Sequence, residues 1–320
     1  MKFRTEIKCI PGSVKIDYQS NVVLLGSCFS EHMVEKFNYF KFNTYANPFG
    51  ILFHPRAIET AVQKCVNQTF YGQNDLLQYG EAWISLDHHS SFDQRDPQLV
   101  LQGINNEIEI GYQELKRASH VIITLGTSWV YRWKKDGRIV GNCHKIPQKY
   151  FTKELLTSRE IQISLRQIIT YVRSINKKAS FIFTLSPVRH LKDGFTENTL
   201  SKALLYAAIQ ALKEDGLAAY FPAFEIMMDD LRDYRFYKSD LVHPNEMAVD
   251  YIWELFKNSW ISESSIRTMV QIEDIQKSLS HKPFDPESEA HKKFLRSLEL
   301  KIEHLQTRYP QINFKKKGSD

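Results

Sequence analysis

Residues 21–30 read NVVLLGSCFS, and this stretch decides the fold. Its first half is a continuous apolar run, typical of a strand that is buried on both faces. Apolar residues then recur over residues 29–40 with the period of a helix. Gly26 separates the two segments and allows the chain to turn tightly. The stretch therefore predicts a buried strand, a tight turn and a helix.

The same alternation continues along the chain. Further buried strands are predicted at residues 121–125 (VIITL), 181–185 (FIFTL) and 219–226 (AYFPAFEI). Helical periodicity occupies residues 158–176, 200–215 and 246–257. Continuous apolar strands that alternate with helices indicate a mostly parallel sheet covered on both faces. We therefore expect an α/β three-layer sandwich with about five parallel strands.

Two internal regions depart from this alternation. Residues 41–118 are rich in Asn, Gln, His and aromatic residues, and we expect loops and short helices there, at one edge of the sheet. Residues 129–142 contain two apolar segments around a central Asp-Gly pair. That pattern predicts a β-hairpin, since Asp-Gly favours a tight turn between strands.

The C-terminal part of the chain is polar and helical. Two prolines interrupt it, and residues 289–307 form a charged amphipathic pattern. A basic run, KKK at 315–317, precedes the last three residues and predicts a frayed tail. We therefore expect a main domain at residues 1–260, followed by a C-terminal helical extension and basic tail at residues 261–320.

Composition excludes several classes of protein. With 42% hydrophobic and 25% charged residues among 320, the chain has ordinary globular composition. The net charge is +5, and Lys and Arg are interspersed with acidic residues, so we expect no nucleic-acid partner. No run approaches the ~18 apolar residues of a membrane helix, and residues 1–17 lack a secretory pattern. We expect a cytoplasmic protein without a membrane partner.

The cysteines give no sign of a metal site or a disulfide. Cys9, Cys28, Cys65 and Cys143 are far apart, and none belongs to a CxxC or Cys/His cluster. We expect reduced thiols, no bound metal and no cofactor.

The turn after the first strand is the first candidate site. Ligands of parallel α/β sheets bind at the carboxyl ends of the strands, and Ser27 and Cys28 stand at such an end. At the start of a helix, free backbone N–H groups stabilise an oxyanion, and the helix dipole lowers the pKa of a thiol. The alternative interpretation is structural, because a free cysteine is more often a small buried hydrophobe.

The second candidate site is Asp240-Leu241-Val242-His243-Pro244, directly before a predicted helix. An aspartate three residues before a histidine can bind one ring nitrogen and fix the tautomer. The other ring nitrogen then accepts a proton from a nucleophile. The alternative is a surface loop that only caps the helix.

The two sites together resemble the SGNH/GDSL hydrolases. In that superfamily a strand-end G-D-S motif carries the nucleophilic serine, and D-x-x-H carries the base. Aligned on G-D-S, this chain reads GSC, and the resemblance implies Cys28 as the nucleophile. It also implies His243 as the general base and Asp240 as the residue that orients it. Ser27 takes the nucleophile's role if the turn differs by one residue.

The string GSCFS at 26–30 is similar to the eponymous motif of the GSCFA family, with serine as its last residue. Other segments similar to that family are NPFG at 47–50, TLGT at 124–127, NCH at 142–144, SPVRH at 186–190 and LRDYRFY at 231–237. The resemblance covers residues 20–258. It implies an SGNH fold, which is flavodoxin-like, but no particular substrate.

The resemblance also implies an oxyanion hole built from the nucleophile's N–H, a glycine N–H and an asparagine side chain. Gly50 is the candidate glycine, although its NPFG segment also reads as a plain structural turn. The asparagine expected after Gly126 is missing from this chain. Ser128 or Asn142 are the candidates to replace it.

Four further residues are predicted to bind substrate. Arg189 follows a predicted strand and can hold an anionic group bidentately, although a solvated surface arginine is the equal alternative. His190 beside it, Asn47 and His144 belong to the segments that resemble the family. His144 is expected to line the same cleft as Arg189.

These observations predict an acyl-ester hydrolase or acyltransferase that works through a covalent acyl-enzyme. The expected substrate is a small-molecule or carbohydrate ester, with a carbohydrate O-acetyl group suggested by analogy with the superfamily alone. The alternatives are a thiol-dependent amidase or transferase, and a ligand-binding module without catalysis. The sequence gives no indication of the oligomeric state.

Overall fold

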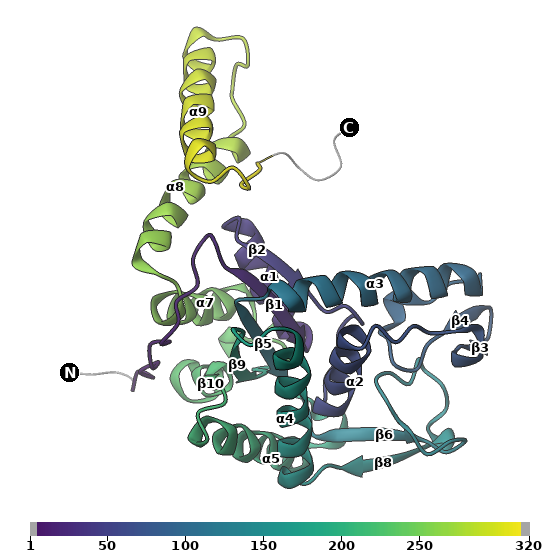
Figure 1. Ribbon diagram of the computed structural model, residues 1–320. Helices are drawn as coiled ribbons and strands as arrows, with labels where there is room; N and C mark the ends of the chain where they lie inside the picture. Colours follow the sequence, from purple (N-terminus) through teal and green to yellow (C-terminus); the bar gives the residue numbers. More distant parts are fainter. Residues whose placement is uncertain (1–4, 315–320) are drawn as a thin grey trace.

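The computed structural model describes residues 5–314, and its centre is a five-stranded parallel sheet (Figure 1). The strand order is β10-β9-β5-β1-β2. The strands are β1 (Asn21–Gly26), β2 (Asn43–Ala46), β5 (His120–Leu125), β9 (Ser180–Leu185) and β10 (Ala219–Phe221). Helices cover both faces, so the predicted α/β sandwich with a parallel five-stranded sheet is confirmed. The basic run at 315–317 lies outside the described residues.

Successive residues of the central strands pack into two different cores. In β1, Val23 and Leu25 face one layer of helices, whereas Val22 and Leu24 face the other. The first layer contains α2 (Pro55–Val66), α3 (Pro97–Arg117), α4 (Ser158–Ile175) and α5 (Phe195–Glu214). The second contains α1 (Cys28–Tyr39) and α7 (Glu246–Trp260), and the hydrophobic cluster on that side continues to α8 (Glu263–Ser280).

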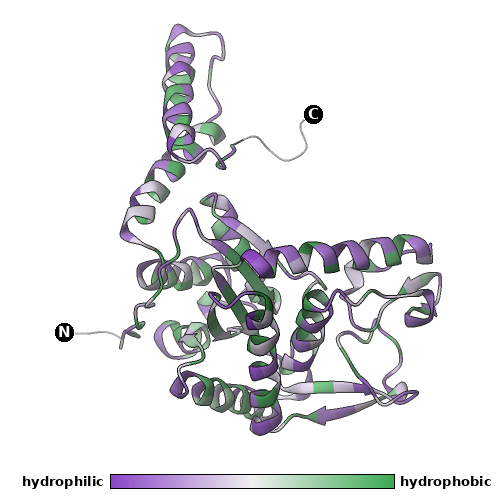
Figure 2. Cartoon of the chain, in the orientation of Figure 1, coloured by the Kyte–Doolittle hydropathy of each residue, from purple (hydrophilic) through white to green (hydrophobic). Residues whose placement is uncertain are grey.

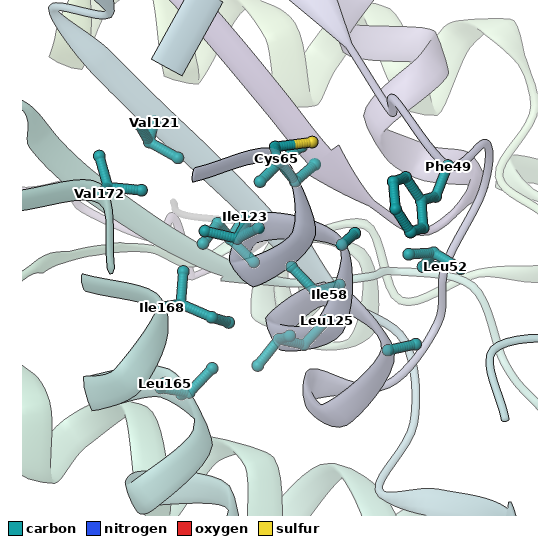
Figure 3. Close-up of a cluster of buried hydrophobic side chains, with 14 of the residues drawn as sticks. Phe49, Leu52, Ile58, Cys65, Val121, Ile123, Leu125, Leu165, Ile168 and Val172 are labelled. Carbon is teal, nitrogen blue, oxygen red and sulfur yellow. The ribbon is translucent and has the colours of Figure 1, made fainter. Parts of the chain in front are cut away.

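Figure 3 shows part of the first core. Side chains of β5 lie between those of α2 and α4, and the labelled residues include Ile58, Ile123 and Ile168. These three side chains are fully or almost fully buried. Continuous apolar strands arise in this way, because both faces of the sheet are covered.

The register of the sheet brings the strand ends to one edge. Gly26 of β1 pairs with Thr124 of β5, which pairs with Thr184 of β9. The segments that follow these three strands therefore meet at the same edge, where parallel α/β sheets bind ligands.

The region at 41–118 is more ordered than the sequence analysis predicted. It contains the edge strand β2, the helix α2 and the 21-residue helix α3. The prediction of loops and short helices holds for the 3-10 helices Gln73–Asp75 and Ser90–Phe92 and the loops around them, and was wrong for α3. The buried face of α3 is formed by Val100, Ile104 and Ile108, which recur every four residues and pack on the core.

The prediction of a strand at 219–226 was correct only for its first three residues. β10 ends at Phe221, and the chain turns helical from Ala223 as far as Leu231. Pro222 explains the change, since its nitrogen cannot donate to a sheet. Its carbonyl instead accepts a hydrogen bond of 3.0 Å from the N–H of Ile226.

The predicted β-hairpin is present. β6 (Trp129–Trp133) pairs antiparallel with β7 (Ile139–Val140), and a third strand, β8 (Phe151–Leu155), pairs with the other edge of β6. A second, smaller hairpin joins β3 (Leu77–Tyr79) and β4 (Ala82–Ile84).

Helices α8 and α9 (Glu289–Arg308) extend from the main body as a helical arm (Figure 1). Hydrophilic and hydrophobic residues alternate along α9, in contrast to the mainly hydrophobic central strands (Figure 2). The base of the arm is anchored on the domain: the rings of Tyr309 and Tyr18 lie 5.0 Å apart, and Gln311 Nε2 donates to the Tyr18 carbonyl. No helix within residues 5–314 is long and apolar enough to span a membrane.

Candidate active site

The turn between β1 and α1 is held by three backbone features. Gly26 has a φ of 125°, and its N–H donates to Asn47 Oδ1 at 2.9 Å. The N–H of Ser27 donates to the Thr124 carbonyl at 3.0 Å. A Cβ atom at Gly26 would lie 2.1 Å from that same carbonyl oxygen. Only glycine fits there, and it aims the next residues at the edge of the sheet.

Cys28 is the first residue of α1 and is partly exposed. Burial raises the pKa of its thiol, and the nearby charge of Glu31 adds to this effect. The backbone N–H groups of Cys28 and Phe29 and the charge of Lys202 act in the opposite direction. The thiol therefore stands beside the helix N-terminus and a cation, which both favour an anion at this position.

Ser27 is placed differently from its neighbour. The residue is 0% exposed, and its hydroxyl has no hydrogen-bond partner within residues 5–314. Its carbonyl accepts from both the N–H and the hydroxyl of Ser30. A substrate has no access to the Ser27 hydroxyl in this arrangement.

Asp240 and His243 form a hydrogen-bonded pair. Asp240 Oδ2 lies 2.7 Å from His243 Nδ1, and Asp240 Oδ1 accepts from the backbone N–H groups of Val242 and His243, each at 2.9 Å. Led by the bond from the His243 N–H, these contacts lower the pKa of Asp240 to about 2. The pair has the geometry that the spacing predicts, and its catalytic role stays a prediction.

The loop that carries His243 is tied to the loop after β9. The N–H of Arg189 donates to the Val242 carbonyl at 3.2 Å, and the Arg189 guanidinium lies 4.1 Å from the centre of the Tyr237 ring. This stacking holds Arg189 against the loop that contains Tyr237. Its Nε atom is buried and has no hydrogen-bond partner among the residues described.

Two candidates for the oxyanion hole are engaged elsewhere. The N–H of Gly50 donates to the Asn47 carbonyl at 2.7 Å, which closes a turn. The Ser128 hydroxyl is fully buried and lies 3.0 Å from the hydroxyl of Ser201. Both groups satisfy internal hydrogen bonds, and their assignment to the oxyanion hole stays a prediction. Asn142 lines a cleft, where its Oδ1 accepts from the N–H of His144.

Two of the predicted substrate-binding residues, Asn47 and His144, have side chains that are held by other parts of the protein. Asn47 does not line the cleft: its side chain bridges the Gly26 N–H and the Ser30 hydroxyl, so it supports the nucleophile turn. His144 lines the cleft, but its ring is held by Asp93 at 3.1 Å and by the Ser85 carbonyl at 2.8 Å.

A cleft of about 600 Å³ lies between the β6–β7 hairpin and the loop after β9. Its apolar wall contains Phe53, Trp129, Tyr131, Val140 and Ile146. Its polar lining contains four predicted residues, Asn142, His144, Arg189 and His190, and it extends to Val242 beside His243. Val242 precedes His243 in the chain, but neither His243 nor Cys28 is among the described residues that line the cleft.

The sequence analysis assigned no site role to Cys143 or Lys202. Cys143 lines the cleft, and burial raises the pKa of its thiol to about 11. Lys202 is buried in α5, where its Nζ donates to the Ser186 carbonyl at 2.7 Å. The signal for Lys202 was present, because Leu205, Ile209 and Leu212 continue the same buried stripe of the helix. A lysine on such a stripe is uncommon.

No direct hydrogen bond joins Cys28 to His243 within residues 5–314. Lys202 interacts electrostatically with Cys28, and His190 interacts with Lys202 and His243. Burial lowers the pKa of His190 to about 3, and its interactions with Lys202 and His243 act in the same direction. Among residues 5–314, no group of three or more His, Cys, Asp or Glu is arranged to hold a metal ion.

Two solved structures are similar to this chain at low identity. One, from Parabacteroides merdae and described as a GDSL-like lipase, has 11% identity and a TM-score of 0.38, over 77% of this chain and 97% of that one. The other is an acetyl xylan esterase from the rumen bacterium Butyrivibrio proteoclasticus, with 13% identity and a TM-score of 0.37, over 75% of this chain and 64% of that one. Both scores are low, so neither structure indicates the reaction of this chain.

A search of curated proteins gave no match. Family models, in contrast, cover most of the sequence. The model described as the GSCFA domain protein, C-terminal domain, matches residues 272–318, which include α9. The model of the GSCFA family matches residues 21–256, from β1 into α7, and the chain therefore belongs to the GSCFA family.

Proposed function

We propose that this protein is an acyl-transfer enzyme that cleaves an ester through a covalent intermediate on Cys28. The observation that carries the proposal is the 2.7 Å bond between Asp240 and His243, in a loop that is tied to the segment after β9 through the Arg189 N–H and the Val242 carbonyl. A carboxylate bound to Nδ1 leaves Nε2 of the imidazole to accept a proton. Hydrogen bonds between nucleophile and base are often long before substrate binds, so the missing Cys28–His243 bond does not oppose this role.

The reaction would proceed in two halves. His243 Nε2 takes the thiol proton of Cys28, and the sulfur attacks the carbonyl carbon of the ester. The C–O bond then breaks, the alcohol leaves with the proton from His243, and a thioester remains on Cys28. Water or a second alcohol, deprotonated by His243, attacks the thioester. The C–S bond breaks, and the thiol regains its proton.

Cys28 suits the role of the nucleophile better than Ser27. Cys28 is partly exposed, whereas the Ser27 hydroxyl is enclosed. The start of α1 also supplies the N–H groups of Cys28 and Phe29, which approach the sulfur. Since Gly50 and Ser128 are engaged, these N–H groups, with the Asn142 side chain, would stabilise the oxyanion.

The cleft suits a small ester, such as an O-acylated sugar. Its volume of about 600 Å³ is typical of small-molecule sites, and aromatic walls with a few polar groups suit a sugar ring. Trp129 and Tyr131 would stack on the ring, while Arg189 and Asn142 would bind its oxygens. Nothing in the cleft calls for a nucleic acid or a membrane surface.

Hydrolysis of short-chain p-nitrophenyl esters tests the proposal. We expect the wild type to release p-nitrophenol, and Cys28→Ala and His243→Ala to reduce the rate at least about 100-fold. Ser27→Ala and the matched thiol control Cys9→Ala should retain activity. Loss of activity in Ser27→Ala, with Cys28→Ala active, would reassign the nucleophile.

An inactive wild type would point to the alternatives. If it cleaves thioesters or amides but no ester, and alkylation of Cys28 stops that reaction, the chain is a thiol-dependent transferase or amidase. If it turns over none of these substrates and binds a sugar ester without change, it is a binding module, and the proposal fails.

A further inference from the structure

Lys202 is an unusual buried cation. The residue is 3% exposed, its Nζ donates to the Ser186 carbonyl at 2.7 Å, and it lies 5.4 Å from the centre of the Phe224 ring. Within the described residues, no carboxylate pairs with it. An ammonium group without a counter-charge is costly to bury. A functional reason for its position is therefore worth testing.

The position of Lys202 relates it to the nucleophile. Ser186, its hydrogen-bond acceptor, directly follows β9, and Cys28 follows β1 by the same sheet edge, with β5 between the two strands. The Ser186 N–H donates to the Leu125 carbonyl of β5, which fixes the end of β9 in this row. The Lys202 ammonium therefore lies at the carboxyl end of β9, and β1, which leads to Cys28, ends at the same edge of the sheet.

The charged groups around the pair come from different elements. Glu31 of α1 opposes a negative charge on Cys28, and Lys202 of α5 favours it. His190, after β9, faces Lys202 and His243 and stays neutral because burial lowers its pKa to about 3. Lys202 is therefore the cation that acts on the sulfur from inside the protein.

We infer that Lys202 is the counter-charge of the site, a positioning residue that stabilises negative charge on Cys28. This inference rests on the proposed function, in which Cys28 is the reacting group. The negative charge that forms on the Cys28 sulfur is then balanced by a buried ammonium group.

The pH dependence of the charge on Lys202 gives a test of its effect on Cys28. Burial lowers the pKa of Lys202 to about 7, and the Cys28 charge opposes that shift. Lys202 is therefore mostly charged at pH 6 and favours the thiolate there. Above pH 7 it loses its proton, and the advantage disappears as the pH rises.

The rate of Cys28 alkylation by iodoacetamide measures this effect, because only the thiolate reacts. The reagent is uncharged. Trypsin places the four cysteines on four different peptides, and that of Cys28 spans residues 16–36, so mass spectrometry follows each thiol separately. The His243→Ala background removes the titration of the imidazole from the profile.

In that background, Lys202→Met should slow alkylation of Cys28 about tenfold at pH 6, equal to about one unit of pKa. The two profiles should converge by pH 9. Lys202→Arg should keep the faster rate over the whole range, because guanidinium stays charged. The control Lys213→Met, at the exposed end of the same helix, should match its parent.

Superimposed profiles for Lys202→Met and its parent would overturn the inference. If Lys202→Met does not fold, the parent profile decides alone: an inflection near pH 7 supports the inference, and a straight rise through pH 7 overturns it. Ester hydrolysis by the wild type is a separate readout. If Lys202→Met slows Cys28 alkylation but the wild type hydrolyses no ester, only the proposed function is refuted. If the wild type hydrolyses esters but the two alkylation profiles superimpose, only the role of Lys202 is refuted.

Discussion

Asp240 uses both carboxylate oxygens to hold its own loop and the imidazole of His243. These bonds lower its pKa to about 2, below the ordinary value of 3.8. For a carboxyl group with a lowered pKa, the stabilisation is present above pH 3.8 and is lost as the pH falls towards 2. The orientation of His243 should therefore persist throughout the neutral and mildly acidic range.

Asp240→Asn should lower kcat for ester hydrolysis at pH 7 about 100-fold, because the amide no longer fixes the imidazole tautomer. Asp240 acts through His243, so the double variant with His243→Ala should be no slower than His243→Ala alone. Asp233→Asn is the control, since Asp233 also caps a nearby turn through its side chain. Additive losses in the double variant would contradict this role.

For individual residues, the sequence predicted contacts between near neighbours in the chain better than contacts between residues far apart in it. The Asp240–His243 bond spans three residues, so spacing alone indicated it. Ser128 is held by Ser201, 73 residues away, and no pattern in the sequence reveals that contact. The proximity of Lys202 to Cys28 depends in the same way on how α5 packs against the sheet.

Among the elements, the turn from β1 to α1 has the least tolerance for change. Gly26→Ala should lower the free energy of unfolding by about 3 kcal/mol, because the left-handed backbone and the Thr124 carbonyl both oppose a Cβ atom. Gly137 has a φ of 78°, and a Cβ atom added there would have no atom within 4 Å. Gly137→Ala should therefore lower the free energy of unfolding by only about 1 kcal/mol. Urea unfolding measures both, and equal costs would argue against the clash.

Element predictions succeeded where one pattern was strong. β1, β5 and β9 are continuous apolar runs and were predicted within about one residue of their ends. α3 was missed because its many polar residues hide a stripe of only a few buried positions. β2 is a short edge strand with mixed burial, and its place in the sheet follows from pairing with β1.

For the whole molecule, the arm and the domain share one core. Tyr309 and Ile312 pack in the same cluster as Tyr18 and Phe42 of the main body. Tyr309→Ala should therefore destabilise the whole protein by about 3 kcal/mol and leave a single unfolding transition. Leu300→Ala, an exposed position of α9, should change stability by less than about 0.5 kcal/mol. A separate early transition in Tyr309→Ala would mean that the arm unfolds alone.

The order of the site along the chain has a consequence during synthesis. Cys28 leaves the ribosome about 200 residues before His243, a delay of about 10 to 40 s at ordinary elongation rates. Lys202 also follows late, and β1 has to wait for β5 and β9 before it is flanked on that side. When Cys28 emerges from the ribosome, neither the base His243 nor the cation Lys202 has yet emerged. Newly made chains therefore lack the assembled site until the last third of the domain has emerged and the sheet is complete.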